Sequence, residues 1–146
     1  MSADELSDLN LKDDFQEARK VEDASRWKLE MPASMEIFAT MGSTLIKDEH
    51  FQARLLWRLY PIEAPSLKFR DPITGKLDLP TAWPIVRGFR PTSLDACVSW
   101  CIEGFDLHPE WKNDARYQWD PRGNVLLKVL RILQYELDNF CQGRNK

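Results

Sequence analysis

The chain has 146 residues, of which 43% are hydrophobic, and 20 Lys and Arg stand against 23 Asp and Glu, leaving a formal net charge of -3. A chain of this length can bury a core without disulfides or a structural metal, and its scattered basic residues form no footprint for a phosphate backbone or an anionic lipid surface. No apolar run approaches the roughly 20 residues that span a bilayer. We therefore expect one domain over residues 1–146, with no nucleic acid and no membrane among its partners.

The cysteines and the first residues bear on the cellular compartment. Cys97, Cys101 and Cys141 are odd in number and include no CxxC pair, which argues against the disulfide framework of a secreted protein. Residues 1–14 are acidic, unlike the basic start of a signal peptide. We expect free thiols and a cytoplasmic protein.

The N-terminal segment predicts a short amphipathic helix. Leu11, Phe15 and Ala18 fall at helical spacing, and either Asp8 or Asn10 is suited to cap a helix that contains them. Residues 1–10 are then expected to form a flexible lead.

Three strands are predicted between residues 35 and 69. The run MEIFATM over residues 35–41 is rich in bulky side chains and ends at a Gly-Ser turn. Apolar and polar residues alternate over residues 51–59, a period typical of a half-buried strand, and a short strand over residues 66–69 follows two prolines. Three consecutive strands favour an antiparallel meander.

The next segment has two parts. Residues 70–91 contain frequent Pro and Gly among few periodic positions, which predicts a Pro-rich, irregular loop. Over residues 92–103 five apolar positions share a helical spacing: Leu94, Cys97, Val98, Cys101 and Ile102. Cys97, Ser99 and Cys101 also alternate as in a strand, so helix and strand both remain open here.

The last predicted element is a long helix that begins after Asn124, a suitable cap, and stops before Gly143. Its apolar stripe consists of Leu126, Val129, Leu130, Leu133, Leu137, Phe140 and Cys141. Cys141 is therefore expected to be structural. An N-terminal helix, a β-meander, an irregular loop and a long C-terminal helix predict an α+β fold with helices packed on one sheet.

Residues 39–69 carry a family resemblance. Residues 39–43 read as a turn, residues 51–59 as a middle strand, and residues 60–69, YPIEAPSLKF, as a tyrosine-proline segment. In this order they resemble the ubiquitin-conjugating enzymes, whose corresponding segment has the form Y-P-F-x-P-P-x-V-x-F. The family's His-Pro-Asn tripeptide is absent, and the long interval from Phe69 to Cys97, which contains Trp83-Pro84, is similar to divergent bacterial members.

The resemblance implies a ubiquitin-conjugating-like fold and an enzyme that carries a ubiquitin-like modifier as a cysteine thioester. Its implied partners are that modifier, its activating enzyme and a substrate or ligase protein, and it implies no cofactor. Cys97 is the leading nucleophile and Cys101 the second candidate, while His108 can donate a hydrogen bond in place of the absent Asn or act as a base. The acidic residues that can orient an attacking lysine are Asp95, Glu103 and Asp106.

Two other functions are compatible with the same residues. Free cysteine is among the most buried residue types, so Cys97 and Cys101 can both be core residues of a catalytically inactive binding module with the same fold. Cys97, Cys101 and His108 also form Cys-x3-Cys-x6-His, three residues that can bind zinc in a small zinc-supported domain, although no fourth ligand is evident. The primary expectation includes no metal site.

Overall fold

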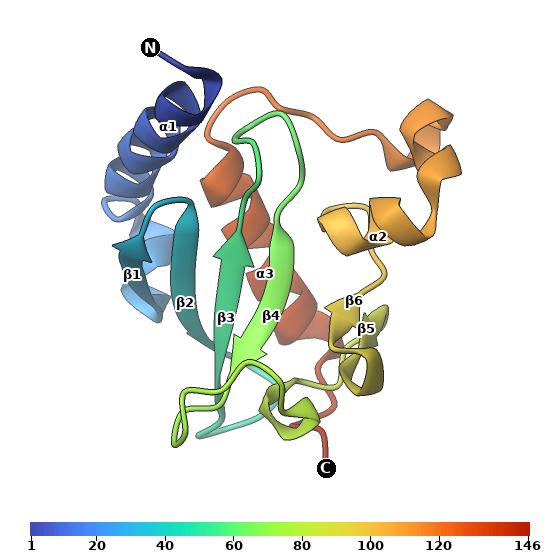
Figure 1. Ribbon diagram of the computed structural model, residues 1–146. Helices are drawn as coiled ribbons and strands as arrows, with labels where there is room; N and C mark the ends of the chain where they lie inside the picture. The colour runs from blue at the N-terminus through green and yellow to red at the C-terminus, as the bar shows by residue number, and fades with distance from the viewer.

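The computed structural model describes residues 1–146 and contains an antiparallel sheet with a long helix behind it (Figure 1). The sheet has the strand order β1-β2-β3-β4, with β1 (Trp27–Ala33), β2 (Glu36–Gly42), β3 (His50–Leu56) and β4 (Ser66–Arg70). Helix α1 (Ala3–Ala18) precedes the sheet, and α3 (Val125–Phe140) ends the regular structure. The predicted α+β arrangement is confirmed.

Helix α1 begins at Ala3, well before the predicted caps. The Ser2 hydroxyl accepts a hydrogen bond from the Glu5 N–H at 3.1 Å, and the Glu5 carboxylate accepts one from the Ser2 N–H at 3.2 Å. This capping box satisfies two N–H groups at the helix start. The residues expected to form a flexible lead are therefore helical from Ala3 onward, whereas the predicted buried positions, Leu11, Phe15 and Ala18, are confirmed.

Burial alternates along β3, as the sequence predicts, and along β4, whereas β2 buries the consecutive residues 37–39; the apolar face of the sheet packs toward α3. Strand β3 ends at Leu56, three residues earlier than predicted. The Trp57 N–H still donates to the Met35 carbonyl at 3.0 Å, in register with the β2–β3 pairing, and the chain then turns, with the Glu63 N–H donating to the Leu59 carbonyl at 3.0 Å. Strand β1 was not predicted. Its inward residues, Trp27 and Leu29, do alternate, but the register shifts after Glu30 and hides the period.

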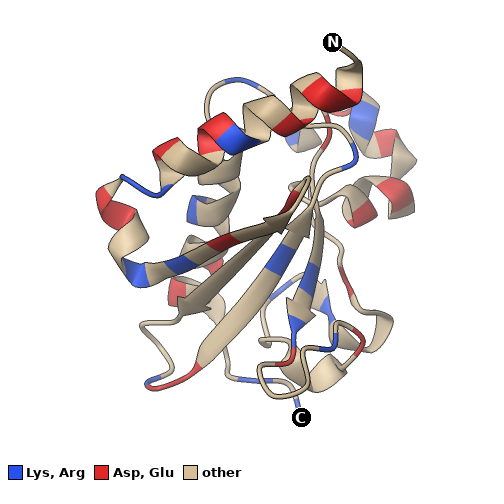
Figure 2. Ribbon diagram, turned by 60° about the vertical axis from the view of Figure 1, so that its left-hand side comes forward, with Lys and Arg blue, Asp and Glu red and all other residues tan.

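The outer face of the sheet carries paired charges. Acidic residues recur along α1, whereas basic residues lie on β3 and on the edge strand β4 (Figure 2). On the outer face Arg54 lies 3.7 Å from Glu36, and Arg70 lies 3.3 Å from Glu30. These pairs balance much of the basic charge on the two strands.

Neither a single helix nor a single strand covers residues 92–103. A two-stranded hairpin of β5 (Phe89–Arg90) and β6 (Asp95–Ala96) is followed by a turn and by helix α2 (Ile102–Leu107), which lies beyond the edge of β4 (Figure 1). Both periods were therefore wrong for most of the segment: Cys97, Ser99 and Cys101 lie in no strand, and of the five positions at helical spacing only Ile102 lies in a helix. Five 3₁₀ segments complete the chain: Glu22–Arg26, Pro80–Ala82, Pro91–Ser93, Pro109–Asn113 and Ala115–Tyr117.

Helix α3 supplies the buried stripe that closes the core. Asn124 caps it as predicted, with its side-chain oxygen accepting from the Leu127 N–H at 2.9 Å. Cys141 is buried at the C-terminal end, whereas Phe140 is partly exposed beneath the Arg87 guanidinium, 3.7 Å from its ring centroid. No helix in the chain has the length and apolarity that crossing a bilayer demands.

Candidate functional site

Cys97 is the one cysteine whose side chain is not buried. It directly follows β6, and its N–H donates to the Gly88 carbonyl at 2.8 Å, which extends the β5–β6 pairing by one residue. Cys101 is fully buried at the start of α2, and Cys141 is 3% exposed. Burial raises the pKa of the Cys101 thiol well above its ordinary value, and the charge of Glu103 raises it further. A buried neutral thiol is a poor nucleophile, so the accessible thiol chemistry of this chain lies at Cys97.

Burial also governs the third thiol. It raises the pKa of Cys141, whose Sγ lies 3.8 Å from the Gly143 carbonyl oxygen. Cys141 is therefore structural, in agreement with its place on the α3 stripe.

An ion pair spans the hairpin next to Cys97. Arg90 and Asp95 are directly opposite each other, and the guanidinium donates to both carboxylate oxygens, from Nε at 2.7 Å and from Nη2 at 2.8 Å. Asp95 is nearly covered, with a side chain 15% exposed, whereas the Arg90 side chain is 43% exposed. The pair keeps its bidentate geometry at the surface, and the Asp95 carboxylate raises the pKa of Arg90.

The backbone around the hairpin is closely constrained. Gly88 has φ +82°, and a Cβ there would stand 2.7 Å from Val98 Cγ1, so only glycine fits this position without displacement. Leu94 also has a positive φ of 57°, at the end of the 3₁₀ turn that links β5 to β6. The Lys68 ammonium on β4 donates to the Leu94 carbonyl and ties this turn to the sheet. Cys97 therefore lies on a rigid support.

Helix α2 rests directly on the turn that follows Cys97. A Cβ at Gly104 would lie 2.1 Å from the Val98 carbonyl oxygen, so the backbones of helix and turn are in contact there. The first N–H of the helix, that of Ile102, donates to the Pro65 carbonyl at 2.8 Å. These contacts fix α2 against the loop before β4 and against the segment after Cys97.

The acidic residues predicted to assist Cys97 have other partners. Glu103 accepts a hydrogen bond from the Leu67 N–H at 3.2 Å and so covers the free edge of β4. Asp106 lies 4.0 Å from Arg58, and its side chain is 57% exposed. Neither carboxylate shares a hydrogen bond with Cys97.

His108 belongs to an aromatic stack at the far end of α2. Its ring stacks on Trp111 with 4.4 Å between centroids, and Trp111 stacks in turn on Tyr117 at 4.5 Å. The His108 Nδ1 lies 3.1 Å from a Glu110 carboxylate oxygen. The backbone N–H of His108 donates to the Gly104 carbonyl at the helix end, and its ring forms no hydrogen bond to Cys97.

The zinc alternative is wrong. No group of three or more His, Cys, Asp or Glu side chains in the chain is placed to hold a metal ion. Cys101 lies in the core, while His108 lies in the partly exposed aromatic stack. The Cys-x3-Cys-x6-His spacing therefore does not bring three ligands to one point.

Sequence reasoning missed Arg90, the cation that faces Asp95. The available signal was the segment RPTSLD at residues 90–95, which places opposite charges on either side of a proline-containing turn. Opposite charges that flank a tight turn become cross-strand neighbours in a hairpin. Without a prediction of the hairpin, that pairing could not be recognised.

A shallow apolar groove of about 220 Å³ lies between the loop before β4 and α2. Ile62 is 58% exposed at this groove, whereas Phe105 is buried. The Trp119 indole N–H donates to the Pro61 carbonyl at 3.0 Å and holds the side chain at the rim. The full lining consists of Ile62, Glu63, Ala64, Ile102, Phe105, Lys112 and Trp119.

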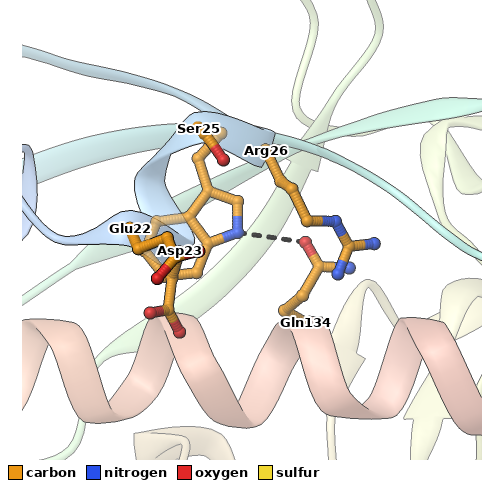
Figure 3. Close-up of a pocket in the computed structure, with 6 residues that line it drawn as sticks. Glu22, Asp23, Ser25, Arg26 and Gln134 are labelled. Carbon is orange, nitrogen blue, oxygen red and sulfur yellow. Dashed lines mark hydrogen bonds between the residues drawn. The ribbon is translucent and has the colours of Figure 1, made fainter.

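A polar recess of about 330 Å³ lies between the 3₁₀ turn at Glu22–Arg26 and α3 (Figure 3). The Gln134 side-chain oxygen accepts a hydrogen bond from the Trp27 indole N–H at 3.0 Å. Arg26 donates to both oxygens of Asp138 at 2.8 and 2.9 Å and holds the pKa of that carboxyl below its ordinary value. Because these polar groups bond to one another within the chain, we interpret this recess as part of the packing contact between β1 and α3 and not as a ligand site.

No family model, curated protein or solved structure matches this chain.

Proposed function

We propose that this chain is a divergent ubiquitin-conjugating-like protein that carries a ubiquitin-like modifier as a thioester on Cys97. The observation that supports this most is the selective exposure of Cys97 among three cysteines, on a rigid hairpin beside the Arg90–Asp95 pair. The order of a helix, a four-stranded antiparallel sheet, an irregular loop and a C-terminal helix agrees with the resemblance carried by residues 39–69.

The proposed reaction needs a thiolate at Cys97 and an activated acyl donor. The thiolate attacks the carbonyl carbon of the modifier's thioester on the activating enzyme, the new C–S bond forms, and the donor thiolate leaves. In the second step an amine attacks the same carbonyl, Cys97 leaves as a thiolate, and the amine nitrogen loses a proton to solvent or to a partner. The modifier is thereby joined to the amine as an amide.

A peptide prepared as a C-terminal thioester tests the first step with the whole chain. We expect native protein to gain the peptide's mass at Cys97, to lose it on treatment with dithiothreitol, and to react faster than the same chain in denaturant. Cys97→Ser abolishes the adduct that dithiothreitol cleaves, and the matched control Cys101→Ser retains it. An adduct that persists in Cys97→Ser, or a native rate below the denatured rate, would contradict the proposal.

A binding module without thiol chemistry is the second candidate, favoured by the apolar groove at Ile62 and Phe105. An exposed isoleucine beside an apolar recess is a common feature of a protein-binding surface. Timed alkylation of native protein separates the two candidates. Rapid modification of Cys97 alone supports thioester carriage, and modification only after unfolding supports the binding module.

A further inference from the structure

Arg90, Asp95 and Cys97 share one face of the β5–β6 hairpin. The register pairs Arg90 with Asp95, and the hydrogen bond from the Cys97 N–H places Gly88 opposite Cys97. Residues two apart in an extended segment point to the same face, so Asp95 and Cys97 do so, and Arg90 is the diagonal neighbour of Cys97. Diagonal neighbours are about 7 Å apart at Cα, which is within reach of an arginine side chain.

The guanidinium has unused donors on this face. Asp95 engages Nε and Nη2, while Nη1 donates to no protein atom. A guanidinium has five N–H donors, so those on Nη1 remain available for an anion.

Other charged groups around the hairpin are engaged elsewhere. The Lys68 ammonium binds the Leu94 carbonyl, and the Glu103 carboxylate binds the Leu67 N–H. Arg90 is the cation that the hairpin register places diagonally across from Cys97.

We propose that Arg90, held in position by Asp95, stabilises the Cys97 thiolate and the oxyanion that forms when a thioester carbonyl is attacked there. The oxyanion part of this inference rests on the proposed function, whereas the thiolate part does not. When the C–S bond forms, the carbonyl π electrons move onto oxygen, and the Nη1 N–H groups donate to that oxygen. When the leaving thiolate departs, those electrons restore the carbonyl, so Arg90 neither gains nor loses a proton. Arg90 thereby supplies a donor in a sequence that lacks the His-Pro-Asn tripeptide, and Asp95 is a positioning residue.

The test is the pH dependence of Cys97 alkylation by iodoacetamide in the native chain, followed by peptide mass spectrometry. We expect Arg90→Gln to raise the pH of half-maximal rate and to slow alkylation at neutral pH by about 1.4-fold to fivefold, the range for a partly exposed charge pair. Arg90→Lys retains the charge and most of the rate. Asp95→Asn shifts the profile less than Arg90→Gln, because the guanidinium is kept and because losing its positioning is opposed by losing a negative charge that repels the thiolate.

Arg87→Gln is the matched control. Arg87 directly precedes Gly88, and its guanidinium pairs with Glu136 at 3.3 Å and lies over the Phe140 ring. We expect its alkylation profile to match the wild type. Raising the salt concentration on wild-type protein gives a test without a variant, because screening of the attraction must shift the profile in the same direction as Arg90→Gln.

The outcomes separate the inference from the proposed function. If neither Arg90→Gln nor salt shifts the alkylation profile, the proposed role of Arg90 is overturned. This holds whether or not the peptide thioester acylates Cys97. A profile that Arg90→Gln moves, together with wild-type protein that the peptide thioester does not acylate, supports the thiolate role and contradicts thioester carriage. A shifted profile with a matching loss of acylation in Arg90→Gln supports both.

Discussion

Replacement of Gly104 by alanine is a direct test of the contact between α2 and the turn after Cys97. The added Cβ would lie 2.1 Å from the Val98 carbonyl oxygen and 2.9 Å from Trp111 Cζ3, whereas real Cβ contacts essentially never fall below 3.0 Å. The Val98 carbonyl cannot simply turn away, since it accepts the Cys101 N–H at 3.3 Å. Helix and turn must therefore separate by about 1 Å, a displacement typical of an overpacked core.

The size of the effect follows from two opposing contributions. Overpacking against a fixed backbone costs about 3 kcal/mol at the upper end of its range, while alanine favours a helix over glycine by about 1 kcal/mol. We expect Gly104→Ala to lose about 2 kcal/mol of unfolding free energy, the difference between those two amounts. For a chain of this size that corresponds to a fall in Tm of roughly 6–8 °C.

Urea denaturation and thermal unfolding measure this loss, and alkylation of Cys101 in native protein reports whether α2 has moved. Asp106→Ala is the control in the same helix, because its side chain is 57% exposed and its removal should change stability by less than about 0.5 kcal/mol. An unfolding free energy for Gly104→Ala equal to or above that of the wild type would refute the close contact. Helix propensity alone predicts that opposite result.

Three further predictions concern contacts that join the helices to the sheet. Tyr60→Phe removes the hydroxyl that donates to Asp14 and accepts from the Leu126 N–H at 3.0 Å, so urea denaturation should show a loss of about 1–3 kcal/mol, and no loss would contradict these bonds. Burial raises the pKa of Asp14, so its contribution to stability is full below the pKa of the unfolded carboxyl and is lost as pH rises through the higher folded pKa. As pH increases from about 4, the unfolding free energy of the wild type should therefore fall relative to that of Asp14→Asn. A rise would contradict a raised pKa of Asp14. Gln134→Leu leaves the Trp27 indole N–H without its acceptor and should cost about 1–3 kcal/mol, with faster exchange of that indole proton by NMR, whereas unchanged exchange would argue against the bond.

Much of the fold could be predicted where neighbouring residues determine it. The α3 stripe and the alternation in β3 were recognised because burial on one face imposes a period on the sequence, whereas β2 was recognised from its bulky side chains and the turn that follows them. Strand β1 was not predicted, because its register shift interrupts the alternation of buried and exposed residues. The start of α1 was missed because the Ser2–Glu5 capping box was not considered.

The candidate site was predictable only in part. The sequence singled out Cys97 by its position after the Pro-rich loop. It also predicted that Glu103 and His108 assist Cys97, although the fold places both of them against other partners. Glu103 binds the edge of β4 and His108 stacks on Trp111. Arg90, which lies across from Asp95, was not considered.

The sequence by itself determined the α+β class, the C-terminal helix with its cap and the free state of the thiols, because each depends on local period, local capping or residue count. Only the tertiary structure decided which thiol is accessible to solvent and which charged side chains lie beside that thiol. Cys97 and Cys101 are four residues apart, yet one follows a surface hairpin and the other enters the core. That difference arises from the pairing of β5 with β6 and the close packing of α2 on the Val98 turn, which are contacts between segments that local periodicity does not encode.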